Sequence, residues 1–459
     1  MAARVIIIGA GVSGLSTAYF LGKLGIASLL LEKSERLGGL IKTDVVDGCQ
    51  LEAGPDSYIA SKPAVTELAQ ELGDLGREII PSNDKARRVF IRKHGRMIPM
   101  PPGMVFMVPS ELKPAFESPL FSVQSKLRFL TERFARPRRR NKDISVGQLV
   151  REHFGEEMLD YVAEPLLAGV YGGDATALSA ASVLPRFVAY EEKYGSLIAG
   201  AREERRAQGS HAGAMFQSFQ GGMQSLTDAL AAATRAHTEI CHGEAIHVSQ
   251  SEDAWQVETT IGSFASREVV LACPAHVASR LLRGAVPVVA GELAGIPYSS
   301  AILVTLVFER ASISHSLNGF GFLVPRRERN TIAAATWINT KFPSRIADGR
   351  AAIRAFIVGE QATRLLPREN VELLSLVRRD LSQLMGVEAE PRFATAYKWP
   401  DSMPQYVVGH SERHQRLRAA LEQHPGIHLV GNAYSGVGVP DCVRMAKDTS
   451  LVIRSRIAA

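Results

Sequence analysis

The sequence predicts a chain of mixed α/β and α+β class, in which a Rossmann-type domain is interleaved with an antiparallel-sheet domain and a mostly helical lobe. Three observations predict this arrangement. Residues 5–33 alternate between apolar strand and helix patterns around a glycine turn, residues 86–210 carry mostly helical spacing, and residues 296–400 are rich in β-branched and aromatic strands. At 459 residues the chain exceeds the size of one hydrophobic core, so we expect two or more domains.

The N-terminal segment has the pattern of one βαβ unit. Residues 5–11 (VIIIGAG) form an apolar run that enters a glycine turn, residues 13–24 have helical apolar spacing, and residues 27–33 (ASLLLEK) form a second apolar run. Strands that are apolar throughout are typical of a parallel sheet covered on both faces. A glycine turn and helix recur at residues 428–453, so both ends of the chain are expected in one domain.

The remaining segments suggest the domain boundaries. We expect a discontinuous nucleotide-binding domain over residues 1–85, 211–295 and 401–459, a helical lobe over residues 86–210, broken by a glycine loop at 169–174, and a substrate-binding sheet domain over residues 296–400. The chain therefore passes between domains several times.

Composition excludes several classes of function. Hydrophobic residues make up 46% and charged residues 22%, which is typical of a globular protein. The net charge of +6 is spread along the chain except at residues 136–140 (RPRRR), and no nucleic-acid recognition motif accompanies it. The four cysteines are scattered, which suits a reducing cytoplasm, and no histidine or cysteine cluster has metal-binding spacing.

We expect any contact with a membrane to be peripheral. The N-terminus lacks the layout of a signal peptide, and no run approaches the roughly 20 apolar residues of a membrane span. The apolar residues 100–108 and the amphipathic, basic run to residue 140 suggest contact with the inner face of the cell membrane. The alternative is an ordinary surface helix with a charged end.

A glycine motif indicates dinucleotide binding. Gly9, Gly11 and Gly14 stand between a strand and a helix that contains Ser13, where backbone can approach a diphosphate at the helix N-terminus. Glu32 ends the second strand and is placed to accept hydrogen bonds from both ribose hydroxyls of an adenosine. A structural glycine turn with a surface glutamate is the alternative.

The residues that follow Glu32 favour FAD over a nicotinamide cofactor. Arg36, Gly38 and Gly39 offer a cation and further backbone donors to the diphosphate. The run from Lys33 to Thr43 resembles the FAD-binding signature of the flavin amine oxidase superfamily, from which Leu40 departs by replacing an arginine. The alternative is a glycine loop without a ligand.

The resemblance implies further FAD-binding residues. The C-terminal glycine turn would place a helix N-terminus at the flavin ring, whereas residues 54–57 would lie beside it, and a small β element would contact adenine. Superfamily members with covalent flavin attach it through a cysteine of their own C-terminal motif, but Cys442 follows the turn here, so we expect non-covalent FAD. These cofactor-binding residues are Gly54, Pro55, Asp56, Ser57, Ala245, Val248, Trp399, Gly431, Asn432, Val437, Gly438 and Val439.

Within this superfamily the chain resembles the protoporphyrinogen oxidases, including the bacterial enzymes that oxidise coproporphyrinogen. Seven segments in the same order carry the resemblance, at residues 51–63, 87–101, 165–179, 218–226, 319–325, 398–410 and 431–442. It implies a propionate-binding Arg88, with Arg87 as the alternative register, and an apolar pocket for the macrocycle. The implied pocket residues are Gly169, Phe320 and Leu323, with a poorer alignment for Ile332 and Ala333; for each of them a structural role is the alternative.

The resemblance also implies the chemistry. We expect FAD and molecular oxygen to support the six-electron oxidation of protoporphyrinogen IX in heme biosynthesis, with coproporphyrinogen III as the alternative substrate and hand-off of the product to the next enzyme of that pathway. No catalytic side chain is assigned, and His410 is expected to be structural. The rival functions are an amine oxidase, a carotenoid-type desaturase, or a non-enzymatic escort protein of the same fold.

Overall fold

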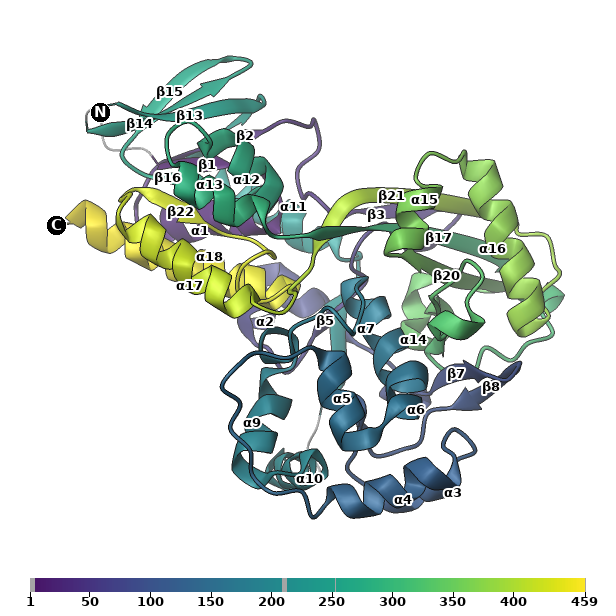
Figure 1. Ribbon diagram of the computed structural model, residues 1–459. Helices are drawn as coiled ribbons and strands as arrows, with labels where there is room; N and C mark the ends of the chain where they lie inside the picture. Colours follow the sequence, from purple (N-terminus) through teal and green to yellow (C-terminus); the bar gives the residue numbers. More distant parts are fainter. Residues whose placement is uncertain (1–4, 209–212, 252, 459) are drawn as a thin grey trace.

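The computed structural model describes residues 5–208, 213–251 and 253–458. The domain boundary expected between residues 210 and 211 lies outside the described residues. The same holds for residues 1–4 and 459, at the two ends of the expected nucleotide-binding domain. Three parts are visible in Figure 1: a parallel sheet with its helices at the upper left, a long mixed sheet at the right, and a helical lobe at the bottom.

A five-stranded sheet is built from both ends and the middle of the chain. Its order is β12–β2–β1–β16–β22, and every neighbouring pair is parallel. The strands are β1 (Val5–Ile8), β2 (Ser28–Glu32), β12 (Thr238–His242), β16 (Val269–Leu271) and β22 (Ile427–Leu429). β1 and β16 are buried throughout, because helices and the strands of residues 245–266 pack with this sheet in one apolar core.

Helix α1 (Val12–Lys23) contacts both α11 (Gln224–Thr234) and α18 (Val439–Ala458) beside this sheet. A small antiparallel sheet of β13 (Ala245–Ser251), β14 (Ala254–Thr259) and β15 (Gly262–Ser266) stands at its outer end in Figure 1. Other elements of the parallel-sheet part are α2 (Ala64–Glu71), α12 (Ala275–Leu282), α13 (Pro287–Ala294), α17 (His410–Glu422), and the sheet of β5 (Tyr58–Ile59), β11 (Phe216–Phe219) and β6 (Ile79–Pro81). The hairpin of β3 (Thr43–Val46) and β4 (Cys49–Glu52) packs instead against the second large sheet.

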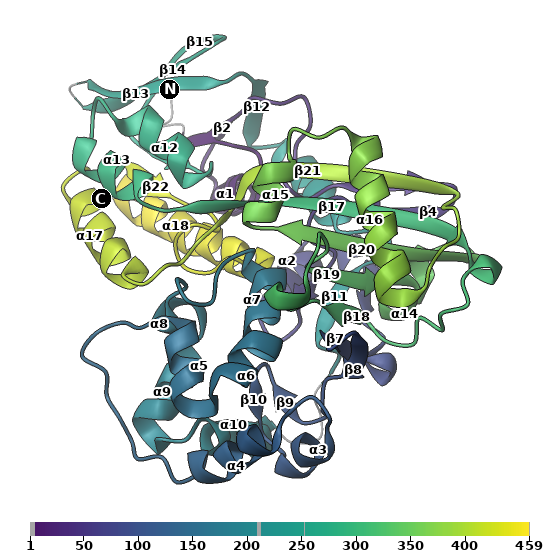
Figure 2. The ribbon, with the colours of Figure 1, turned by 45° about the vertical axis from the view of Figure 1, so that its right-hand side comes forward.

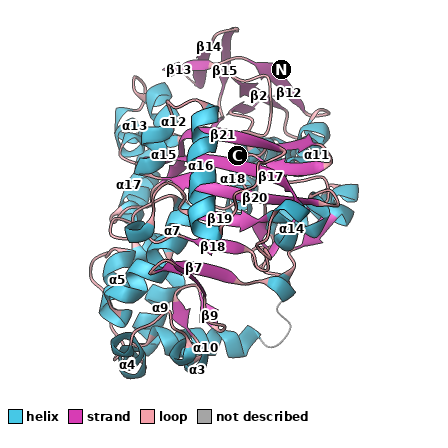
Figure 3. Cartoon of the chain, turned by 90° about the vertical axis from the view of Figure 1, so that its right-hand side faces the viewer, coloured by secondary structure: helices cyan, strands magenta, loops and turns pink. Residues whose placement is uncertain are grey.

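The second large sheet has seven strands in the order β21–β17–β20–β19–β18–β7–β8. They are β21 (Phe393–Pro404), β17 (Tyr298–Glu309), β20 (Arg350–Val358), β19 (Ala334–Trp337), β18 (Gly321–Leu323), β7 (Val89–Lys93) and β8 (Arg96–Pro99). All pairs are antiparallel except β18 with β7. Figure 3 shows α16 (Asn370–Met385) lying across one face; α15 (Glu360–Leu365) and α14 (Ile338–Lys341) also contact the sheet.

Two details correct our expectations for this region. Residues 89–99, which we placed in the helical lobe, form the edge hairpin β7–β8. The parallel pairing of β7 with β18 satisfies backbone N–H and C=O groups of β7, and the local sequence pattern does not reveal this long-range pairing. In addition, β21 continues past residue 400 to Pro404, since it pairs with β17 along its length.

The helical lobe packs around its own core (Figure 2). Ser122, Ser145 and Ser179 each cap a helix by accepting a backbone hydrogen bond. The lobe contains α3 (Leu112–Glu117), α4 (Val123–Glu132), α5 (Val146–Phe154), α6 (Glu156–Met158), a π-helical turn (Leu159–Ala163), α7 (Glu164–Tyr171), α8 (Ala180–Val183), α9 (Pro185–Tyr194), α10 (Leu197–Gln208) and the short strands β9 (Met104–Val105) and β10 (Val108–Pro109).

Two further expectations about the lobe were wrong. Gly169 lies within α7, and the glycine loop begins only at Gly172, whose left-handed φ of 61° ends the helix. The apolar run at residues 100–108 is not an exposed surface, because Met107 and Val108 are fully buried and its other apolar side chains pack against the lobe core. No helix of the described chain is long and apolar enough to span a membrane.

Candidate functional site

The first glycine turn is built so tightly that side chains cannot enter it. A Cβ atom on Gly14 would lie 1.8 Å from the carbonyl oxygen of Gly9, and one on Gly9 would lie 2.9 Å from the carbonyl oxygen of Ala272. Gly9 also has a φ of +104°, which favours glycine. Gly11 stands at the start of α1 without a side-chain cap, so the N–H groups of the first turn of α1, where Ser13 lies, face the turn.

Glu32 is held in a fixed orientation at the end of β2. Its Oε2 accepts the N–H of Ala10 at 2.8 Å, and its Oε1 accepts the N–H and the hydroxyl of Ser34 at 2.9 and 2.8 Å. A carboxylate offers about four lone-pair sites, and these three bonds leave one site, on Oε2, for a ribose hydroxyl. Its neighbour Lys33 is exposed.

The second glycine loop lies directly against the first. The N–H of Gly38 donates to Ala10 at 2.8 Å, and a Cβ atom on Gly39 would lie 3.1 Å from the Cα of Gly11. Arg36 donates to the carbonyl oxygens of Leu37, Gly39 and Ile41, so its guanidinium shapes this loop. Leu40 is partly exposed, and its carbonyl oxygen would lie 1.9 Å from a Cβ atom on Gly54.

The C-terminal glycine turn reaches the same place. The thiol of Cys442, in the first turns of α18, interacts with the hydroxyl of Ser13 in the first turn of α1. Asp441 accepts the N–H of Gly438 at 3.3 Å and pairs with Lys62 at 2.7 Å. The starts of α1 and α18 therefore converge. The segment that leads into α18, from Gly431 and Asn432 to Val437, Gly438 and Val439, thus ends beside the first glycine turn.

A buried ionic cluster holds residues 54–57. Lys341 donates to both carboxylate oxygens of Asp56 at 2.9 Å and to the hydroxyl of Ser57 at 3.0 Å. Arg354 donates to the carbonyl oxygen of Gly54, and Arg345 donates to that of Asp56 at 3.0 Å and pairs with Glu52 at 3.1 Å. Burial alone would raise the pKa of Asp56, but the nearby Lys341 and Arg354 hold it well below its usual range. Pro55 lies within this fixed loop.

Trp399 joins that loop to an apolar wall. Its indole N–H donates to the carbonyl oxygen of Ala53 at 2.6 Å. The ring packs in a cluster that includes Ala168 of α7, Leu303 and Val358 of the seven-stranded sheet, and Ala333 just before β19, with Tyr397 and Met403 beside it. The wall thus lies next to the segment at residues 53–57.

The predicted pocket residues divide between two faces of the sheet. A Cβ atom on Gly169 would lie 3.8 Å from the Cδ2 of Leu323, so these two positions are neighbours. Ala333 lies in the apolar wall, whereas Ile332 is fully buried in the core beneath α16, where its N–H donates to Asp380 at 2.8 Å. Ile332 therefore packs in a different apolar cluster from Ala333 and does not belong to that wall.

The two arginines are both exposed, with different partners. Arg88 donates to the side-chain oxygen of Asn318 at 2.6 Å, and its carbonyl oxygen accepts the N–H of Phe320 at 2.7 Å. Arg87 pairs with Asp84 at 3.1 Å. Arg88 is therefore tied to the strand that carries Phe320 and Leu323, and Arg87 is not.

The other residues singled out in the sequence differ in their surroundings. Ala245 begins β13 and is half-buried, whereas Val248 is buried in the core of the parallel-sheet domain. His410 stacks on Tyr406 with ring centroids 3.9 Å apart, and burial lowers its pKa. Burial raises the pKa of Cys442 to about 11, so its thiol stays protonated at neutral pH. Within the described ranges no group of side chains could hold a metal ion.

Several site residues were missed in the sequence. Ala272 closes the first glycine turn, and Lys341, Arg345 and Arg354 hold the residues at 54–57. One signal was available for Arg354, because it interrupts the otherwise apolar strand AAIRAFIVG. Lys341 and Arg345 carry no such signal, since charged residues outside apolar strand patterns are ordinary.

The residues present fit FAD. Glycine positions that a Cβ atom would fill allow a diphosphate to approach, two helix N-termini face it, and a carboxylate stands where an adenosine ribose would bind. These features, joined to an apolar wall, define an FAD-dependent oxidoreductase.

The comparisons with known proteins agree with this class. Residues 12–453 match the family model of flavin containing amine oxidoreductases, so the chain belongs to this family and its cofactor is FAD.

Three relatives illustrate the family. The chain is 31% identical to the coproporphyrinogen III oxidase of Bacillus subtilis, with 97% of this chain and 96% of that protein covered. It is 28% identical to the chloroplastic protoporphyrinogen oxidase of Nicotiana tabacum, with 97% and 84% covered. A crystal structure from Exiguobacterium, provisionally assigned as a protoporphyrinogen oxidase, superposes with a TM-score of 0.88 at 32% identity and covers 99% of both chains.

Proposed function

We propose that this protein oxidises a porphyrinogen to a porphyrin with FAD and molecular oxygen. The observation that carries the proposal is the junction made by Trp399, which ties the fixed loop at residues 53–57 to the apolar wall around Leu303 and Ala333. A large, largely apolar substrate would lie against this wall beside the cofactor. FAD, when bound, accepts a hydride from the substrate and passes the electrons to oxygen.

The substrate we expect from the sequence is protoporphyrinogen IX. Coproporphyrinogen III is the second candidate, and the name of the Bacillus subtilis relative favours it. In either case the overall reaction converts one porphyrinogen and three molecules of oxygen to one porphyrin and three molecules of hydrogen peroxide, which balances six electrons and six protons.

The chain's own residues would bind and orient the macrocycle. We propose that Arg88 leaves Asn318 to pair with a propionate, because a guanidinium fork matches a carboxylate. Phe320, Leu323 and Ala333 would contact the ring, and Gly169 would leave room for it, since a side chain there would face Leu323. The wall would also exclude water from the reacting carbon. Ile332 is not part of this proposal.

The comparison of two substrates tests the function. Values of kcat/KM under air for protoporphyrinogen IX and coproporphyrinogen III should show turnover of at least one, with a preference that identifies the substrate. Turnover of polyamines or carotenes without turnover of either porphyrinogen would overturn the proposal. A purified protein that contains no flavin would instead support an escort function.

Replacement of Arg88 tests the binding mode. Loss of a charged hydrogen bond costs about 1.5–3 kcal/mol, so Arg88→Ala should raise KM by roughly tenfold or more with a smaller effect on kcat. Arg77→Ala, whose parent side chain is 87% exposed, is the matched control and should leave KM unchanged. An unchanged KM in Arg88→Ala would remove Arg88 from the proposed site.

We also propose peripheral contact with anionic membranes. The exposed apolar ridge of Val123, Leu127, Leu130 and Phe134 on and after α4 supports it, since these side chains recur on one helical face beside basic residues. Leu127→Ser with Phe134→Ser should weaken binding to anionic vesicles at low salt. No binding by the parent protein would refute the contact.

The remaining details are proposals of the same kind. We propose a cytoplasmic protein, at the inner face of the membrane, with non-covalent FAD and hand-off of the porphyrin to the next enzyme of heme biosynthesis. The domain ranges of the sequence analysis stay a proposal, with residues 89–99 moved to the sheet. Acid precipitation should release the flavin into the supernatant if it is non-covalent.

A further inference from the structure

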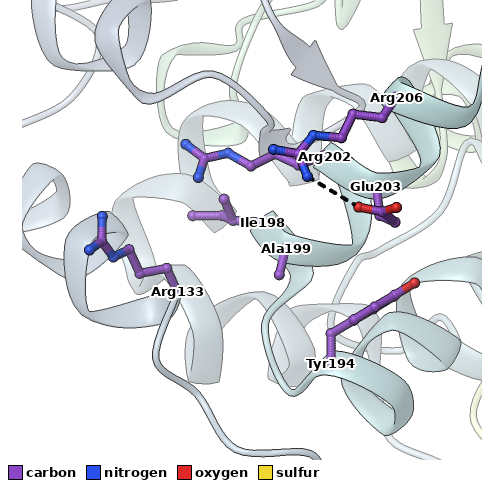
Figure 4. Close-up of a pocket in the computed structure, with 7 residues that line it drawn as sticks. All are labelled: Arg133, Tyr194, Ile198, Ala199, Arg202, Glu203 and Arg206. Atoms are coloured by element: carbon purple, nitrogen blue, oxygen red, sulfur yellow. Dashed lines mark hydrogen bonds and ion pairs between the residues drawn. The ribbon is translucent and has the colours of Figure 1, made fainter. Parts of the chain in front are cut away.

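A hollow of about 360 Å³ in the helical lobe lies between the end of α4 and the helices α9 and α10. It is lined by Arg133, Tyr194, Ile198, Ala199, Arg202, Glu203 and Arg206 (Figure 4). No part of the proposed oxidase site reaches it, so the inference below does not depend on the proposed oxidase activity, although its lipid alternative shares Leu130 and Phe134 with the proposed membrane contact.

The hollow carries a net charge of +2, because three arginines and one glutamate line it. Arg206 pairs with Glu203 at 3.5 Å. Arg202 donates its Nε to the carbonyl oxygen of Ser110 at 2.9 Å, which leaves both terminal nitrogens available. Arg133 has its guanidinium over the ring of Phe134, at 4.5 Å, and pairs with no carboxylate within the described part of the chain. Among residues 5–208, 213–251 and 253–458, the guanidinium groups of Arg133 and Arg202 therefore have no carboxylate partner.

A neighbouring hollow shows that this imbalance is local. That hollow, of about 640 Å³, is also lined by arginines, but Arg138 pairs with Glu152 at 2.9 Å and Arg128 donates to the carbonyl oxygens of Arg151 and Glu152. Its lining contains three arginines and three glutamates. The larger hollow thus has as many glutamates as arginines in its lining, whereas the smaller hollow has one glutamate for three arginines.

The arrangement of the arginines suits a compact oxyanion. In Figure 4 the guanidinium groups of Arg133 and Arg202 extend from different helices to the same side of the hollow, whereas Arg206 turns toward Glu203. The N-terminus of α10 is not the attracting group, because Glu132 already accepts the N–H of Leu197 at 2.6 Å. Guanidinium forks pair with two oxygens of a phosphate at once.

We propose that this hollow binds a phosphate group, through Arg133 and Arg202, as an electrostatic docking site of the helical lobe. The phosphate comes from a lipid headgroup or from a soluble phosphate ester. Leu130 and Phe134, both exposed, flank Arg133, so an acyl chain attached to the phosphate would have an apolar surface to follow.

The test compares two phosphate sources on the FAD-containing protein. One arm titrates inorganic phosphate by calorimetry, and the other measures sedimentation with vesicles of phosphatidylglycerol and phosphatidylcholine against phosphatidylcholine alone. The variant is Arg133→Gln with Arg202→Gln. The control is Lys113→Gln with Arg139→Gln, which removes the same charge from side chains of the same lobe that are 86% and 84% exposed.

The site-specific loss should exceed the control. Removing two charged hydrogen-bond donors should weaken binding by about tenfold or more, whereas loss of distant charge should weaken vesicle binding about equally at any position. Binding of vesicles but not of phosphate, lost in the site variant, assigns a lipid headgroup; saturable phosphate binding without vesicle binding assigns a soluble ester. Equal losses in variant and control, or no binding of either source, would overturn the proposal.

A conservative variant guards against misfolding. Arg133→Lys with Arg202→Lys keeps the charge and removes the fork, so it should bind vesicles more strongly than the glutamine variant and less strongly than the parent. Flavin absorbance and oxidase activity should stay unchanged in all variants, because the hollow is separate from the proposed oxidase site. A lysine variant indistinguishable from the glutamine variant would overturn the assignment of a charged site.

Discussion

The positions of single atoms determine much of the shape of the nucleotide cradle, which is formed by the first glycine turn, the glycine loop at Gly38 and Gly39, and the C-terminal glycine turn. At Gly14 the available space is smaller than one methyl group, because the Gly9 carbonyl oxygen occupies the position that a Cβ atom would take. At Lys341 the ammonium group is buried and is stabilised by Asp56, so each charge depends on the other. A methyl group added at Gly14, or the loss of the ammonium group at Lys341, should therefore disturb the structure around that residue strongly.

Gly14→Ala should destabilise the protein by about 3 kcal/mol or more and abolish flavin retention, because the backbone of the turn must move to admit the methyl group. The measurements are urea unfolding and the flavin-to-protein absorbance ratio. Gly291→Ala, in α13 with no atom within 4 Å of the added Cβ, should stay within about 1 kcal/mol of the parent. Similar losses in both variants would mean that the cradle is not the cause.

Lys341→Met should lower the free energy of unfolding by about 3–5 kcal/mol at neutral pH, because it leaves Asp56 buried with fewer cations. Urea unfolding checks this. Lys113→Met is the control, since Lys113 is exposed and lies 3.9 Å from Glu117, and its loss should cost less than about 0.5 kcal/mol. A Lys341→Met variant as stable as this control would contradict a buried ion pair.

Elements are joined in this protein by a few buried polar groups as well as by apolar packing. Glu157 of α6 accepts hydrogen bonds from the backbone and hydroxyl of Ser122 at the start of α4, both at 2.8 Å. It also pairs with Lys93 of β7 at 2.7 Å. One carboxylate thereby connects the edge of the sheet to two helices of the lobe.

Stability should depend on pH through Glu157. Burial alone would raise its pKa, but the hydrogen bonds from Lys93, Ser125 and Ser122 outweigh burial and lower the pKa to about 2 from 4.5. A carboxyl group whose pKa is lower in the folded protein than in the unfolded protein stabilises the folded state at pH values above the unfolded pKa. This stabilisation is lost as the pH falls through the folded pKa.

Glu157→Gln should therefore cost about 2–3 kcal/mol above pH 4.5, and the difference from the parent should vanish towards pH 2. Urea unfolding at a series of pH values measures it. Glu192→Gln, whose parent side chain is 53% exposed, should show little dependence of this kind. A difference that stays constant down to pH 2 would rule out titration of Glu157 as the cause.

In the whole molecule, strands that lie side by side in the parallel sheet are far apart along the chain. The parallel sheet takes strands from residues 5–8, 28–32, 238–242, 269–271 and 427–429, so its closure requires both ends of the chain. The helix that follows the last of these strands, α18, reaches α1 at Ser13 and Cys442. Ligand binding at this junction should stabilise segments that are far apart in sequence.

Removal of FAD should lower the stability of the protein. A ligand present at about 100 times its Kd adds roughly 2.7 kcal/mol to the folded state, so the apoprotein should melt several degrees lower, and added FAD should restore Tm. Calorimetry of the holoprotein and of the stripped protein checks this. Equal Tm values would show that the cradle contributes no ligand-linked stability.

Much of the nucleotide site was predictable, because its residues are local in sequence. Gly9, Gly14 and Glu32 lie in one βαβ unit whose geometry follows from apolar runs and a glycine turn. The pocket was predictable only in part. Ile332 and Ala333 are adjacent, and a shift of one residue in register moves a side chain to the other face of the sheet, which the sequence pattern did not resolve.

The sequence by itself determined the class of the protein, the N-terminal cradle and the resemblance that led to its cofactor, since each depends on short-range spacing. Tertiary structure alone decided that Lys341 and Arg354 hold the loop at residues 54–57, that residues 89–99 join the sheet, and that Arg133 and Arg202 share a hollow. In each case the contacting residues come from segments that are distant along the chain. The free-energy cost of burying a charge depends on its partner, and that partner is known only from the folded structure.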